Sequence, residues 1–86
     1  MNRIRTKIIY RVLEIMYARK REESAERAMD IVQAYMDGLK DAEQIPRTFK
    51  WYDVEKAMQE DFDAGNIEQA IEAAHGVFDS LPDSWK

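Results

Sequence analysis

The 86-residue chain has no cysteine, only two prolines, three glycines and one histidine. Without cysteine, neither a disulfide nor a thiolate metal site can supplement the core, and nothing indicates an oxidising compartment. No apolar run approaches the ~18 residues that a membrane span needs. Arg11 and Glu14 interrupt the apolar segment near the N-terminus, which argues against a signal peptide. We therefore expect a soluble, cytoplasmic protein that makes no membrane contact.

The chain also lacks the residue groups on which most enzymes depend. There is no glycine-rich phosphate loop, no thiol nucleophile and no Ser, His and Asp set with catalytic spacing. His75 lies at the edge of an apolar helical face, which is typical of a structural histidine. The stretch DFDAGNIEQAIE spaces its carboxylates like a calcium loop, but Asn66 stands where that loop requires glycine. We expect no catalytic residue, no metal and no cofactor, and hence no enzyme.

Apolar residues recur at helical spacing along much of the chain, and no segment alternates apolar and polar residues as a half-buried strand does. The expected helices lie near residues 4–20, 24–38, 49–64 and 66–80. Ser24 and Asn66 suit the N-caps of the second and fourth helices. Gly38 suits the end of the second helix, and Gly65 suits the end of the third. The pattern predicts an all-α, four-helix fold.

The two halves of the chain are related by an offset of 42 residues. Residues 5–39 align with 47–81 without a gap, and nine positions are identical. Such a repeat predicts two related helix hairpins that share one core, because neither can bury its apolar face alone. Residues 21–23 contain no helix breaker, so the first two helices either turn there or form one rod, and the repeat favours the turn. The expected organisation is one domain over 1–86, with hairpins at 4–39 and 47–82, a linker at 39–47 and a tail at 83–86.

The segment GNIEQAIEAAHGVFDSLP resembles the second helix of a tetratricopeptide repeat. Gly65, Ala70 and Pro82 fall where that family has its turn glycine, its helix alanine and its closing proline. Met58 and Asp61 depart from the pattern, since the family has a glycine and an aromatic residue there. The offset of 42 residues also exceeds the family's period of about 34. The resemblance covers about a third of the chain and implies a helix hairpin.

Positions at which the two copies differ should mark the binding surface, because the core explains the shared positions. The first helix carries Ile8 and Leu13. The aligned residues of the second copy are Lys50 and Glu55. The first helix is therefore either the central helix of the bundle or the carrier of an exposed apolar strip that would form a homodimer. The apolar residues that we expect to bind a partner are Ile4, Ile8, Leu13, Phe49, Trp51 and Tyr52.

Charge is unevenly distributed along the chain. Residues 1–27 carry eight basic and four acidic side chains, whereas residues 28–86 carry five basic and thirteen acidic ones. A basic stripe beside tyrosines can bind phosphates and stack on bases, but the net charge of −4 argues against a nucleic-acid-binding domain. The basic residues that we expect to bind a partner are Arg3, Lys7, Arg11 and Arg21. A separate acidic surface is expected at Asp53, Glu55, Glu60 and Asp61.

These features predict a small helical regulatory protein that binds a protein partner and forms a homodimer. One alternative is an acidic inhibitor that occupies the basic nucleic-acid-binding groove of another protein through electrostatic complementarity. A second alternative is a weak nucleic-acid binder that uses the basic face of the first helix.

Overall fold

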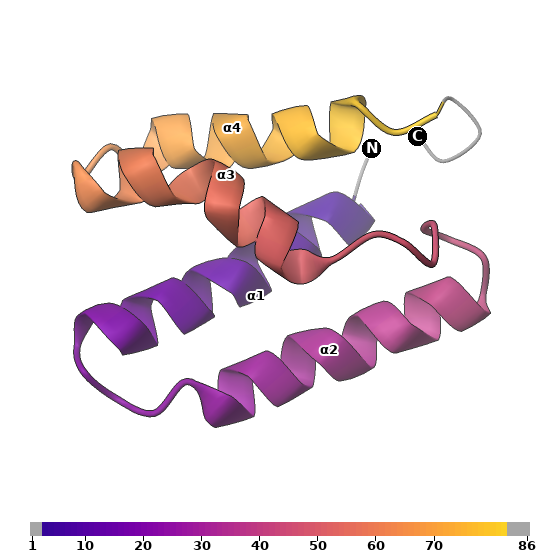
Figure 1. Ribbon diagram of the computed structural model, residues 1–86, viewed down its shortest axis with the longest axis horizontal. Coiled ribbons are helices and arrows are strands. Elements are labelled where there is room, and N and C mark those ends of the chain that lie inside the picture. The colour runs from indigo at the N-terminus through magenta and orange to yellow at the C-terminus, as the bar shows by residue number, and fades with distance from the viewer. Residues whose placement is uncertain (1–2, 83–86) are drawn as a thin grey trace.

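Residues 3–82, which the computed structural model describes, fold into two antiparallel helix pairs (Figure 1). The helices are α1 (Arg3–Lys20), α2 (Glu26–Asp41), α3 (Trp51–Asp63) and α4 (Ile67–Asp79). No strand occurs in this part of the chain, so the predicted all-α, four-helix fold is confirmed. We call α1–α2 the first hairpin and α3–α4 the second hairpin. None of these four helices is long and apolar enough to cross a membrane. The expected tail at 83–86 lies outside the described residues.

The turn of the second hairpin depends on Gly65, as the sequence predicts. Its φ of 81° lies in the left-handed region, which costs glycine little. The Gly65 N–H donates to the carbonyl of Phe62 at 3.0 Å, and the Asn66 N–H donates to that of Asp61 at 2.8 Å. This pair of bonds is the Schellman pattern, and it satisfies two carbonyls that α3 would otherwise leave without a partner.

Helix α1 ends with the same pair of hydrogen bonds, but without glycine and before a longer connection. Glu22 has a φ of 59°, and its N–H donates to the carbonyl of Arg19 at 3.0 Å. The Glu23 N–H donates to the carbonyl of Ala18 at 2.9 Å. The first two helices therefore turn and do not continue as one rod. Glu43, with a φ of 57°, ends α2 in the same way.

Gly38 does not end α2, contrary to the sequence prediction. The helix continues to Asp41 because its last turn still packs on the core: Leu39 is half-buried and Lys40 is buried. At the other end of α2 the N-cap residue is Ala25, one position later than expected. Asn66 is the N-cap residue of α4, as predicted, although its side chain makes no capping hydrogen bond.

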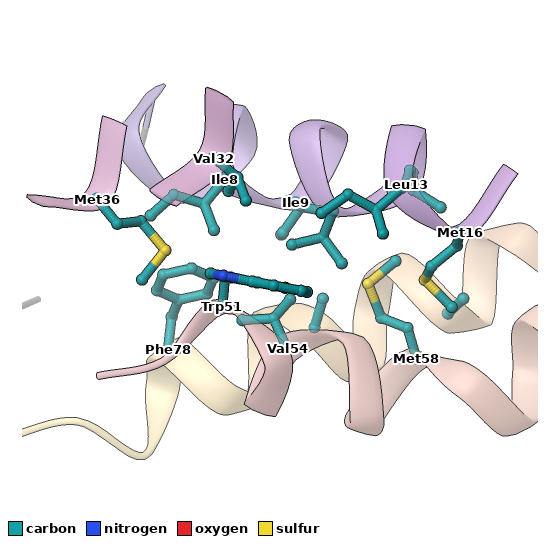
Figure 2. Packing of buried hydrophobic residues seen from close by; sticks show 14 of the residues in the cluster. Ile8, Ile9, Leu13, Met16, Val32, Met36, Trp51, Val54, Met58 and Phe78 are labelled. Atoms are coloured by element: carbon teal, nitrogen blue, oxygen red, sulfur yellow. The ribbon is translucent and has the colours of Figure 1, made fainter. Parts of the chain in front are cut away.

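The hydrophobic core lies between the two hairpins, where side chains from α1 and α2 meet those of α3 and α4 (Figure 2). Positions related by the 42-residue offset are buried together. Val12 and Val54 are both 0% exposed, and Met16 and Met58 are also both buried. The helix packing is therefore compatible with the pseudo-repeat.

Helix α1 contacts each of the other three helices, as α3 also does. Ile8 is 0% exposed and Leu13 is 5% exposed, both within the core. The expectation that these residues form an exposed apolar strip is therefore wrong. The apolar residues that α1 has where the second copy has Lys50 and Glu55 are therefore core residues. Ile4 is half-buried and packs against the same core.

The segment between the hairpins is packed against the protein. Ile45 and Phe49 are buried, and the Phe49 ring stacks on that of Phe78 with centroids 5.0 Å apart. Trp51 is buried too, and its Nε1–H donates to Oε1 of Gln33 at 3.1 Å. Phe49 and Trp51 are thus core residues, not the surface anchors that we expected.

Candidate functional site

A groove of about 410 Å³ runs between α1 and α2. Its apolar lining comes from Tyr17, Ala18, Ala28 and Ile31. Two of these four residues are alanines, one on each helix, and their small side chains leave the space between the helices unfilled. Charged and polar side chains complete the lining: Glu14, Arg21, Glu23, Ser24 and Arg27. We call this feature the α1–α2 groove.

The groove exposes apolar surface that the core does not use. Ile31 is 38% exposed, which makes it one of the few large hydrophobic residues on the described surface. Tyr17 is half-buried, and its ring meets the Phe62 ring edge-on with centroids 5.0 Å apart. The Arg21 guanidinium lies 5.8 Å from the centroid of the Tyr17 ring. A rigid aromatic residue therefore stands between the core and the groove.

The predicted basic residues lie on one side of α1 and just beyond its end, but most have partners within the chain. Arg11 pairs with Glu14 at 3.1 Å, and the Lys7 ammonium lies 4.5 Å from the Tyr35 ring centroid. Arg21 pairs with Glu23 at 3.5 Å, and Arg3 is exposed. These partners reduce the positive charge that α1 presents.

Arg27 is a groove residue that the sequence analysis missed. It is exposed, and it makes no ion pair within residues 3–82. Its role in the groove depends on how α2 packs against α1, which a single-helix pattern does not reveal.

A second recess of about 290 Å³ lies between α1 and α3. Glu55 lines it, and this residue is 9% exposed and paired with the Arg19 guanidinium. The prediction that Glu55 belongs to an acidic surface is therefore wrong, because the residue fills the position that Leu13 occupies in the first hairpin. The Lys20 ammonium covers the Phe62 ring at 5.7 Å. The charged side chains described in this recess have partners within the chain, so the recess is part of the contact between the two hairpins.

The second hairpin carries an exposed acidic surface. Residues 57–82 contain six acidic side chains and no lysine or arginine. Among the predicted acidic residues, Asp53 and Glu60 are exposed and Asp61 is half-buried. Glu68 and Glu72, one helical turn apart on α4, are also exposed. No three His, Asp or Glu side chains in the described part of the chain are placed to hold a metal ion.

Tyr52 is the predicted aromatic contact residue that does lie on the surface. It is 53% exposed and stands edge-on to the Trp51 ring, with centroids 5.8 Å apart. Tyr10 on α1 is similarly exposed, at 54%. Neither residue lines the α1–α2 groove.

No protein-family model, curated protein or solved structure matches this chain. The groove, the exposed aromatic residues and the separation of charge are therefore the features from which function is inferred.

Proposed function

We propose that this chain is a small regulatory interaction module that binds a protein partner in the α1–α2 groove. The observation that carries the proposal is the exposed apolar lining of that groove, above all Ile31 at 38% exposure. Protein interfaces place apolar side chains at the centre and charged ones at the rim, and they are enriched in Tyr and Arg. Tyr17, Arg21 and Arg27 supply these residue types around the groove.

A protein partner fits the groove better than nucleic acid does. Arg21 pairs with Glu23 and Glu14 pairs with Arg11, so within residues 3–82 Arg27 is the single cation of the lining without an ion-pair partner. Binding to a phosphate backbone depends on an excess of positive charge. Apolar contacts between protein side chains have no such requirement.

The test is affinity capture from the native cell with three forms of the chain: wild type, Ile31→Lys and Ala34→Lys. Ala34 is an exposed residue of α2 that does not line the groove, so its substitution is a matched control. We expect a partner captured by the wild type and by Ala34→Lys, and a reduction of at least roughly tenfold with Ile31→Lys, as hot-spot substitutions give. Circular dichroism should show that both variants are folded. A partner captured equally by all three forms would contradict the groove proposal.

A second candidate function is inhibition of a nucleic-acid-binding protein. The absence of Lys and Arg from residues 57–82, together with the exposure of Glu60, Glu68 and Glu72, favours it. Such a surface can compete with phosphates for a basic groove on another protein. A captured partner should then release its nucleic acid when the chain is added. The Glu68→Gln/Glu72→Gln variant should compete less well, and equal competition would argue against this function.

A further inference from the structure

We propose that the α1–α2 groove receives the acidic side of α4 from a second copy of the chain, so that the protein forms a salt-sensitive homodimer. This inference rests on the proposed function, because it names the partner that the groove binds. It depends on the placement of opposite charges and of partly exposed isoleucines.

Opposite charges without partners lie at the two surfaces. Arg27 lines the groove, is exposed and makes no ion pair within the described residues. Glu68 and Glu72 are exposed on α4, and neither makes an ion pair with any residue between 3 and 82. Their spacing of one helical turn presents both carboxylates on the same side of α4.

These charges do not meet within one molecule. The backbones of α2 and α4 lie at opposite edges of the fold, with α1 and α3 between them (Figure 1). A second copy, in contrast, can place its α4 against the groove of the first. Complementary potentials of this kind orient two proteins as they associate.

The same arrangement buries apolar surface. Ile71, between Glu68 and Glu72 in the sequence, is half-buried against the core and keeps part of its side chain accessible. Ile31 in the groove is 38% exposed. Contact between these two isoleucines would remove apolar area from water, which adds attraction that salt does not screen.

The two surfaces also permit a closed assembly. The groove of each copy would bind α4 of the other, and a two-fold axis would relate the two contacts. Such pairing ends at the dimer, whereas head-to-tail contacts that do not close produce filaments. The proposal therefore specifies a dimer with two equivalent contacts.

The test is the mass in solution, measured by sedimentation equilibrium over a range of protein and salt concentrations. We expect a dimer at low salt that dissociates as salt is added, because exposed charges are screened beyond about 8 Å at physiological ionic strength. Two variants reverse the charges: Arg21→Glu/Arg27→Glu in the groove and Glu68→Lys/Glu72→Lys on α4. Each alone should dimerise at least roughly tenfold more weakly than the wild type.

An equimolar mixture of the two variants should restore the dimer, because the charges at both contacts are then opposite again. The matched control is Lys50→Glu/Lys56→Glu, which makes the same charge change at exposed residues outside the groove and should leave the dimer intact. A wild type that remains monomeric overturns the proposal. A dimer that neither charge reversal weakens, or that the mixture does not restore, overturns it as well.

These outcomes are distinct from failure of the proposed function. A monomeric wild type that still captures another protein through Ile31 would overturn the second-copy proposal. The same result would support the proposed function as an interaction module. Capture of the untagged chain itself, lost with Ile31→Lys and with Glu68→Lys/Glu72→Lys, supports both proposals.

Discussion

The first and second hairpins bury aligned positions but stabilise their helix pairs in different ways. Helices α3 and α4 pack against each other along most of their length and are joined by the short turn at residues 64–66, which contains Gly65. Helices α1 and α2 contact each other less, and residues 21–25 join them through a left-handed Glu22. The first hairpin therefore depends more on contacts with the second, and its looser packing leaves the α1–α2 groove.

The largest effect on stability is expected when a core residue of the first hairpin is replaced by the residue type found at the aligned position of the second copy. Ile8 is 0% exposed, whereas the aligned Lys50 is exposed. Ile8→Lys would bury an ammonium group without a partner, which costs several kcal/mol in a domain whose total stability is about 5–10 kcal/mol. We expect this variant to be largely unfolded at 25 °C by circular dichroism.

The reverse substitution is the control. Lys50→Ile should change the free energy of unfolding by no more than about 0.5 kcal/mol, because the residue is at the surface. A folded Ile8→Lys protein with a wild-type melting temperature would show that Ile8 is not in the core. That result would support the alternative in which α1 carries an exposed apolar strip.

The helices and most of the core could be predicted from the sequence. The spacing of apolar residues predicts both ends of each helix to within three residues. Amphipathic helices of this length have a strong 3.6-residue period, which makes them recognisable. Val12 is identical to Val54 and Met16 to Met58 at the 42-residue offset, and all four residues are buried. Gly65 was recognised because a turn with positive φ favours glycine.

The remaining features depend on tertiary structure. A glutamate in the left-handed region, as at Glu22 and Glu43, gives no signal in the sequence because the residue type is common in helices. The apolar excess of α1 fitted a central helix and an exposed strip equally well, and only the packing distinguishes them. Glu55 looked like a surface residue because its partner Arg19 is 36 positions away. The groove likewise exists only in the relative placement of α1 and α2.

A second comparison concerns Leu13 and Glu55, aligned residues that are both buried. Arg19→Met would leave the Glu55 carboxylate without its ion-pair partner, and we expect a loss of about 1–3 kcal/mol in the free energy of unfolding. Arg19→Met/Glu55→Leu replaces the pair by apolar side chains and should be close to neutral or stabilising. Urea denaturation measures both. A double variant less stable than Arg19→Met alone would show that the pair contributes net stability.

Substitutions in the two turns should have smaller effects on stability, and the two effects should have opposite signs. Glu22→Gly should stabilise the protein and Gly65→Ala should destabilise it, each by about 1 kcal/mol, because only glycine adopts positive φ without steric cost. A Cβ at Gly65 would meet no atom within 4 Å, so the effect there is confined to the backbone. The midpoint of urea denaturation should move in opposite directions for the two variants. A shift in the same direction would mean that the two turns differ in more than their left-handed residue.

The smallest expected effect tests the contact between the hairpins. The Trp51 Nε1–H donates to Oε1 of Gln33 across the boundary, whereas Gln59 donates to Asp63 within α3 at 2.8 Å. Gln33→Ala should cost about 0.5–1.5 kcal/mol, since Trp51 is buried and its N–H would lose a partner. Gln59→Ala removes a bond between exposed groups that water can replace, so its cost should be within about 0.5 kcal/mol. If both variants lost the same stability, the bond from Trp51 would contribute no more to the association of the hairpins than a surface hydrogen bond does.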